Sequence, residues 1–275
     1  MKLLGICTDI DGTLLDSRRQ LSSRTIAAIK NLGKTIPVIL ASSRMPSAML
    51  HLQEELDILH HPMICYNGGY VIHYESSSPT PVVLETVKIP FSICSKIIGM
   101  ANETSLHISL FSEDNWYAPK VDNWTEREER ITKASAIIMR NEEVLNMWRE
   151  TENGAHKIMC MGDEQEIEQM GNELEEKFGE QIHIYRSKST YLELAPRSIS
   201  KASGLERLLQ ERFSHITMAD MAAFGDNYND IEMLKAVGMG IAVGSARDEV
   251  KAAAKEITAN SKEDGVAIAI EKYFK

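Results

Sequence analysis

The stretch LLGICT at residues 3–8 runs directly into DIDGT at residues 9–13, and these eleven residues decide the fold. A short apolar run that ends in Gly and Thr is typical of a buried strand followed by a tight loop. Open α/β sheets bind ligands just beyond the carboxyl ends of their strands, so Asp9 and Asp11 are expected at the edge where chemistry takes place. Alternate side chains of an extended segment share a face, and the two carboxylates can therefore address one substrate. The alternative is an Asp-Gly turn capped by Thr13.

The residues after this stretch alternate between strand and helix patterns. Apolar residues recur at helical spacing between Ser22 or Ser23 and Gly33, and Pro46 begins a second helical pattern. Residues 37–41 and 63–66 are short apolar runs of the kind that form buried strands. This alternation predicts an α/β fold with a Rossmann-like, doubly wound parallel sheet.

The pattern changes in the middle of the chain and returns near its end. Between about residues 91 and 187 the sequence resembles an α+β segment, and strand–helix alternation then resumes. We therefore predict a discontinuous core domain, residues 1–84 and 188–275, with an inserted α/β cap domain at 85–187.

Composition limits the classes of function. The chain has 275 residues, enough for a sizeable core, and a formal net charge of −10, which gives no support for binding nucleic acid. Its four cysteines lack a CxxC pattern and lie in or beside apolar segments, as expected for reduced, buried thiols. No signal-peptide pattern and no apolar stretch of membrane-spanning length is present, so we expect a cytoplasmic protein without membrane contact.

Four motifs follow one another in an order that defines a family. They are DIDGT at residues 9–13, ASSR at 41–44, Lys201, and GDNYND at 225–230, with NGG at 67–69 and EDGV at 263–266 as additional signatures. This series resembles the motifs of the haloacid dehalogenase-like (HAD) superfamily, and specifically its Cof-type phosphatase branch, across essentially the whole chain. The resemblance implies a large cap between the second and third motifs.

The resemblance assigns the chemistry to the first and last motifs. Asp9 is then the nucleophile that forms an aspartyl-phosphate, and Asp11 is the general acid and base. Asp226, the Asp9 carboxylate and the Asp11 backbone carbonyl would bind Mg²⁺, which prefers hard oxygen ligands. Asp230 is expected to orient waters or Lys201 around that site, with simple helix capping as its alternative.

The remaining motif residues are expected to bind phosphate or substrate. Lys201 would hold Asp9 and the phosphate together. Ser43 stands where the family commonly has Gly and can instead cap a helix, Arg44 can instead form a surface salt bridge, and Asn67 and Gly68 fit a plain turn. The full set of expected phosphate or substrate ligands is Gly12, Ser42, Ser43, Arg44, Asn67, Gly68, Lys201 and Asn229.

The sequence thus predicts a Mg²⁺-dependent phosphomonoesterase that acts on a small phosphorylated metabolite. A sugar phosphate is the first expectation, followed by nucleotide or cofactor phosphates such as pyridoxal phosphate or flavin mononucleotide. A phosphomutase and a non-catalytic metabolite-binding protein on the same scaffold are the alternatives. Neither a nucleic-acid nor a membrane partner is expected, and the protein would be a monomer or a homodimer.

Overall fold

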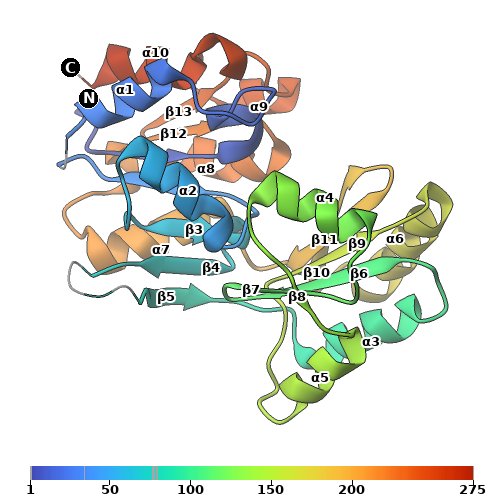
Figure 1. Ribbon diagram of the computed structural model, residues 1–275. Coiled ribbons are helices and arrows are strands. Elements are labelled where there is room, and N and C mark those ends of the chain that lie inside the picture. Colours follow the sequence, from blue (N-terminus) through green and yellow to red (C-terminus); the bar gives the residue numbers. More distant parts are fainter. Residues whose placement is uncertain (1, 34, 76–77, 79, 275) are drawn as a thin grey trace. The chain divides into compact units, whose positions relative to one another are not determined.

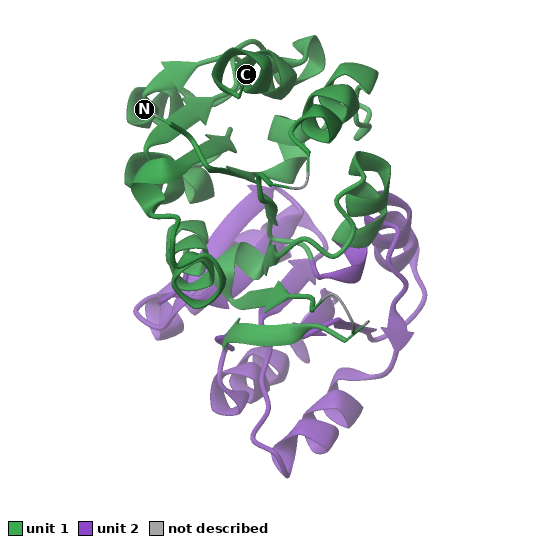
Figure 2. Ribbon diagram, turned by 90° about the vertical axis from the view of Figure 1, so that its left-hand side faces the viewer, with its two compact units in different colours: residues 1–44, 49–85, 200–275 green, residues 45–48, 86–199 purple. Residues whose placement is uncertain are grey.

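The computed structural model describes residues 2–33, 35–75, 78 and 80–274. The chain divides into two compact units, shown in separate colours in Figure 2. The first unit comprises residues 1–44, 49–85 and 200–275, and the second comprises residues 45–48 and 86–199. Each unit is built around its own sheet, and the two are described separately below.

The sheet of the first unit has the strand order β14-β13-β12-β1-β2-β3-β4-β5. Of these strands, Figure 1 labels β13, β12, β3, β4 and β5. The strands from β14 to β3 run parallel, and β4 is antiparallel to β3. Apolar runs buried on both faces explain the central parallel strands. The strand bounds are β1 (Gly5–Thr8), β2 (Val38–Ala41), β3 (Met63–Cys65), β4 (Tyr70–His73), β5 (Val82–Thr86), β12 (Met221–Gly225), β13 (Met239–Ala242) and β14 (Glu256–Ile257).

The helices that follow these strands include two with side-chain caps, α1 and α7, and two pairs that pack together. Ser22 caps α1 by accepting a hydrogen bond from the backbone N–H of Thr25, which decides between the two expected caps. Helix α1 packs beside α10, and α7 packs beside α8. The helix bounds are α1 (Ser23–Asn31), α2 (Ser47–Leu56), α7 (Lys201–Arg212), α8 (Ile231–Ala236), α9 (Asp248–Ala253) and α10 (Gly265–Tyr273).

The second unit is an α+β structure with the strand order β10-β11-β9-β6-β7-β8. One face of this sheet packs on α3, α5 and α6 in a continuous apolar core, and on the other face Trp124 of α4 contacts the ring of Tyr191 edge-on. The bounds are α3 (Phe91–Ala101), β6 (His107–Ser112), β7 (Asn115–Ala118), α4 (Asn123–Thr132), β8 (Ile137–Ile138), α5 (Asn141–Arg149), β9 (Lys157–Met161), α6 (Glu164–Phe178), β10 (Ile182–Lys188) and β11 (Tyr191–Pro196).

The two units of the structure differ from the predicted domains at residues 45–48, 85 and 188–199, and the last of these segments is the longest. Residues 188–199 were expected in the core domain, but β11 pairs antiparallel with both β9 and β10 and therefore belongs to the second unit. The sequence pattern could not assign residues 191–195 to a domain, because such an apolar run fits a strand of either sheet. Its place depends on the strands with which it forms hydrogen bonds.

The cysteines are buried free thiols, as expected. Burial raises the pKa of Cys94 and of Cys160 to about 12, so both thiols are protonated at neutral pH. Among the described residues, no helix is both long and apolar enough to span a membrane.

Candidate active site

Three neighbouring strands of the first unit end beside one another and carry the motif residues. β1 lies between β2 and β12 in the sheet. The chain proceeds from β1 to β2 and β3 on one side and from β12 to β13 and β14 on the other, so the strand order reverses here and this edge is the topological switch point. Asp9 follows β1, Ser42 follows β2 and Asp226 follows β12. The parallel register brings the carboxyl ends of these strands to one edge.

Lys201 joins two of the carboxylates. Its Nζ donates to Oδ1 of Asp9 at 2.5 Å and to Oδ1 of Asp230 at 2.7 Å, and its side chain is fully buried. Burial alone would lower the pKa of Lys201, but the charges of Asp230 and Asp9 outweigh it and raise that pKa. The ammonium group is therefore a permanent cation between two carboxylates.

The Asp9 carboxylate is only half satisfied by hydrogen bonds. Its Oδ2 is buried and accepts no hydrogen bond from the described residues. Burial raises the pKa of Asp9 well above its ordinary value, Lys201 partly offsets this, and the negative charges of Asp230 and Asp226 add to the rise. A buried carboxylate oxygen with no donor calls for a positive partner.

Asp226 lies against the first loop. Thr13 Oγ1 donates to its Oδ1 at 3.1 Å, and Oδ2 lies 2.4 Å from where a Cβ on Gly12 would be, so a side chain at Gly12 is excluded. Gly12 also has φ = +90°, which favours glycine. Burial raises the pKa of Asp226 to about 6, and the charge of Asp230 contributes.

Asp230 has both carboxylate oxygens occupied. Oδ1 accepts from Lys201, and Oδ2 accepts from the backbone N–H groups of Asp226 and Asn227, each at 3.0 Å. It therefore ties Lys201 to the loop that carries Asp226, the arrangement expected of a residue that orients the site.

Two arginines converge on Asp11. Arg44 donates through Nε to Oδ2 and through Nη2 to Oδ1, both at 2.8 Å, and Arg19 Nη1 donates to Oδ1 at 3.2 Å. Burial by itself would raise the pKa of Asp11, but the hydrogen bonds and charge of Arg44, with smaller effects of Arg19 and Lys201, lower it. Arg44 thus forms an ion pair with the motif carboxylate through a buried side chain, which differs from an exposed surface salt bridge. Its expected contact with phosphate or substrate stays a prediction.

The loop that contains Asn67 and Gly68 packs against the start of α7. Tyr66, Asn67 and Gly68 all have positive φ. A Cβ on Gly68 would lie 2.2 Å from the carbonyl oxygen of Ser200, the residue before Lys201. Asn229 donates through Nδ2 to Oδ1 of Asn67 at 3.0 Å. The loop therefore contacts Asn229 through Asn67, and it contacts the backbone of Ser200, just before Lys201, through Gly68.

The serines at the end of β2 have different surroundings. Ser42 is buried, and its Oγ accepts from the backbone N–H of Arg44 at 3.3 Å, which leaves its hydroxyl hydrogen to donate elsewhere. Ser43 is half-buried. Two further residues contact the motif carboxylates without having been predicted: Thr13 donates to Asp226, and Arg19 donates to Asp11. Thr13 lies inside the DIDGT motif, whereas Arg19 lies in a polar loop with no signal of its own.

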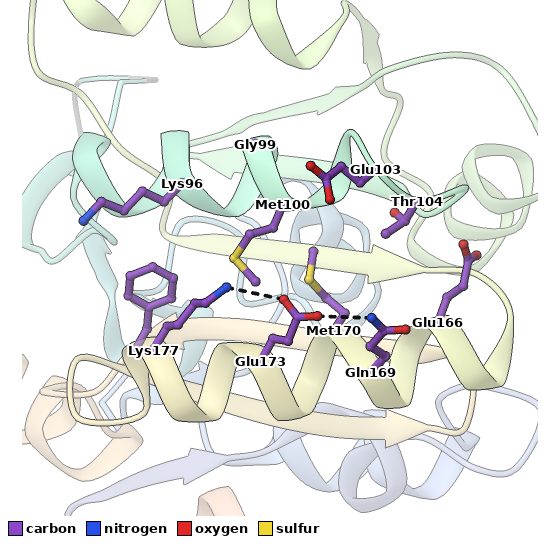
Figure 3. Close-up of a pocket in the computed structure, with 11 residues that line it drawn as sticks. Lys96, Gly99, Met100, Glu103, Thr104, Glu166, Gln169, Met170, Glu173 and Lys177 are labelled. Atoms are coloured by element: carbon purple, nitrogen blue, oxygen red, sulfur yellow. Dashed lines mark hydrogen bonds and ion pairs between the residues drawn. The ribbon is translucent and has the colours of Figure 1, made fainter.

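A groove in the second unit contains none of these residues. It has a volume of about 620 Å³ and lies in the second unit between α3 and α6 (Figure 3). Glu173 pairs there with Lys177 and accepts from Gln169, along the surface of α6. A cavity of about 300 Å³ beside Gly12 in the first unit is smaller but adjoins the motif loop, and it is lined by Ser17, Ser245 and Lys262 among others.

The carboxylate cluster fits a divalent cation. Asp9, Asp226 and Asp230 each offer an oxygen, and these atoms lie within 4.8 Å of one another. Oxygen donors of this kind suit Mg²⁺. Because both oxygens of Asp230 already accept hydrogen bonds, the Asp9 and Asp226 carboxylates are the available ligands.

A doubly wound sheet with this cluster at its switch point defines a hydrolase of the haloacid dehalogenase-like class, and comparison with known proteins agrees. Residues 6–270 match the model of the haloacid dehalogenase-like hydrolases, and the chain belongs to that family. The "Putative phosphatase" of Haemophilus influenzae is 31% identical over 276 residues, 100% of this chain and 99% of its own length. The pyridoxal phosphate phosphatase YbhA of Escherichia coli is 27% identical, covering 95% of each chain. Within the family the chain is a phosphatase, as its full-length relatives are named.

A solved structure supports the same fold. A haloacid dehalogenase-like hydrolase from Bacteroides thetaiotaomicron superposes with a TM-score of 0.86 at 30% identity, over 98% of this chain and 99% of the other. The predicted fold class, an α/β core of Rossmann type with an additional α+β part, is therefore confirmed.

Proposed function

We propose that this phosphatase hydrolyses small phosphomonoesters in two steps through an aspartyl-phosphate on Asp9. The observation that carries the proposal is the state of the Asp9 carboxylate. One oxygen is held by the buried Lys201, and the other is buried with no hydrogen bond from the described residues. A carboxylate fixed at one oxygen and open at the other is suited to attack phosphorus.

The proposed roles of the other residues follow from their contacts. Lys201 holds Asp9 in place and offsets negative charge that develops on the transferring phosphoryl group. Asp11 gives a proton to the leaving alcohol in the first step and takes one from water in the second. Ser42 and Asn229 are proposed to donate to phosphate oxygens, and the glycine at position 12 leaves room for Asp226.

We assign a Mg²⁺ site to Asp9, Asp226 and the backbone carbonyl of Asp11. When bound, the cation neutralises charge between the nucleophile and the phosphoryl group. Asp230 is proposed to orient Lys201 and the Asp226 loop, because its oxygens are already engaged. Gly68 is proposed to act through Ser200 on Lys201, in addition to the substrate contact expected from the sequence.

The substrate is proposed to be a small phosphorylated metabolite, with sugar phosphates first. A relative that is 27% identical is named as a pyridoxal phosphate phosphatase, which supports testing cofactor phosphates as well as sugar phosphates. We propose that the second unit is the cap domain expected from the family resemblance and that it selects the leaving group. A phosphomutase and a metabolite-binding protein are the competing functions.

Phosphate release tests the proposal. Wild-type protein is incubated with sugar phosphates, nucleotides, pyridoxal phosphate and p-nitrophenyl phosphate, with Mg²⁺ or with EDTA. We expect release that requires Mg²⁺ and disappears in Asp9→Asn. Asp248→Asn is the matched control, because it makes the same chemical change at a fully exposed carboxylate of α9.

The outcomes separate the candidate functions. Full activity in Asp9→Asn would remove Asp9 as the nucleophile. Transfer of phosphate between hydroxyls of one sugar, without release, would favour a mutase. Ligand binding by folded wild-type protein with no turnover of any compound would favour a binding protein.

A further inference from the structure

The Arg44–Asp11 pair fixes the plane of the Asp11 carboxylate. Each oxygen of Asp11 receives a hydrogen bond at 2.8 Å from a different nitrogen of the same rigid guanidinium group. Two parallel bonds of this kind prevent rotation of the carboxylate, which one bond cannot do. The Arg44 side chain is only 6% exposed, whereas the side chain of Asp11 is 39% exposed and that of Arg19 is 44% exposed. The arginine is therefore the anchored partner.

The backbone of Arg44 is anchored as well. Its N–H donates to Ser42 Oγ, and its carbonyl accepts from the backbone N–H of Tyr66. Asp11, by contrast, lies in the turn after β1 with extended backbone dihedrals (φ = −81°, ψ = 114°), beside the left-handed Gly12. A side chain on such a turn takes its orientation from side-chain partners, and Arg44 supplies that orientation from the neighbouring strand end.

We propose that Arg44 is a positioning residue for the second half of the reaction, in which Asp11 accepts a proton from water. The inference rests on the proposed function. In that step the water oxygen bonds to phosphorus, the bond between phosphorus and the Asp9 oxygen breaks, and its electron pair returns to the Asp9 carboxylate. The water proton goes to Asp11, which gives it to the leaving alcohol of the next turnover. A carboxylate held at both oxygens by one guanidinium group has a fixed orientation for this transfer.

Substitution of Arg44 should therefore slow hydrolysis of the aspartyl-phosphate more than its formation on Asp9. The probe is p-nitrophenyl phosphate, because its aryloxide leaves without a proton and the first step then does not require Asp11 as an acid. In Arg44→Gln we expect a burst of about one p-nitrophenolate per enzyme molecule, followed by a steady state up to about a hundred-fold slower than wild type, the size of loss that a misplaced catalytic group can cause. Acid-quenched protein should carry one added phosphoryl group, detected by mass.

Two further variants make the test specific. Arg44→Lys keeps the charge but not the two-point contact, so it should also show the burst, with a smaller loss of steady-state rate. Arg24→Gln is the matched control: Arg24 forms the same kind of two-point pair with Glu271, at 3.0 and 2.7 Å, on the exposed surface between α1 and α10. It should behave as wild type.

Two results would overturn the inference. One is an equal slowing of both steps in Arg44→Gln, with no burst and no phosphorylated protein, which is what a merely structural role predicts. The other is full recovery by Arg44→Lys, which would mean that charge alone matters. Failure of the proposed function is distinguishable, because wild-type protein would then release no phosphate, or Asp9→Asn would retain activity.

Discussion

At the residue scale, the first unit concentrates charge where little water can reach it. Lys201, Asp9 and Asp230 are all buried, and one cation serves two anions. Such a group is stable only while each member keeps its partners, because an unpaired buried charge is costly. Asp9 also has one oxygen with no donor among the described residues, and its proposed role as nucleophile depends on that oxygen.

Removal of the shared cation, Lys201, should strongly lower both stability and turnover. Lys201→Ala leaves Asp9 and Asp230 buried without their donor, so we expect a loss of about 3 kcal/mol or more in the free energy of unfolding. Turnover should also disappear. Urea denaturation measures the first effect, and Lys251→Ala, at an ion pair with the exposed Asp248, is the control. An unchanged unfolding midpoint for Lys201→Ala would contradict this account of the cluster.

Asp226 should determine metal affinity. Asp226→Ala removes one of the two carboxylates proposed to bind Mg²⁺. The Mg²⁺ concentration needed to stabilise the protein should therefore rise at least ten-fold. The readout is the melting temperature as a function of Mg²⁺, which does not depend on activity. Asp220→Asn, at an exposed carboxylate bonded to Thr217, should leave the titration unchanged. The same titration curve for Asp226→Ala and wild type would exclude Asp226 from the site.

At the element scale, the loop between β3 and β4 supports the first turn of α7. Ser200 caps α7 by accepting from the N–H of Ser203, and Lys201 is the first helical residue. Gly68 lies against the Ser200 carbonyl with φ = +104°. The position of Lys201 thus depends on close contact between a loop and a helix start that are far apart in sequence.

Two glycine substitutions should have opposite effects. Gly68→Ala places a Cβ 2.2 Å from the Ser200 carbonyl at a positive φ, so it should destabilise the protein and lower kcat by displacing Lys201. Gly99→Ala, in α3, meets no atom within 4 Å and should stabilise by about 0.5 to 1 kcal/mol, because alanine is the better helix former. Thermal unfolding and turnover of both variants test this pair. Equal stability of Gly68→Ala and Gly99→Ala would show that the backbone around Ser200 moves to accept the added methyl group at no cost in stability.

At the scale of the whole molecule, acid sensitivity should arise partly from a buried histidine of the second unit. His156 Nδ1 accepts from the N–H of Glu113 at 2.9 Å, and Nε2 contacts Thr86 Oγ1 at 3.0 Å. Burial, with a smaller effect of Lys88, lowers the pKa of His156 from 6.5 to about 3. A proton on Nδ1 would also face the Glu113 N–H, so the folded state holds this imidazole neutral.

The sign of the pH effect follows from this difference in pKa. Between pH 6.5 and about 3 the unfolded chain binds a proton at His156 that the folded chain does not. Stability from this residue is therefore complete above pH 6.5 and is lost progressively as the pH falls, by a few kcal/mol in total. His156→Asn should make stability less dependent on pH across this range, and the exposed His215→Asn should not. Urea unfolding at pH 7, 5.5 and 4.5 provides the measurement; parallel curves for wild type and His156→Asn would contradict it.

The sequence by itself determined the alternation of strands and helices, the strand ends that carry Asp9, Ser42 and Asp226, and the family to which the chain belongs. Local patterns suffice for these because apolar periodicity and turn residues act over a few positions. Only the tertiary structure decided that β11 joins the second sheet, that Arg44 pairs with Asp11, and that Gly68 contacts Ser200. Each of these joins residues distant in sequence, and which strand pairs with which, or which charge meets which, depends on the packing of the whole unit.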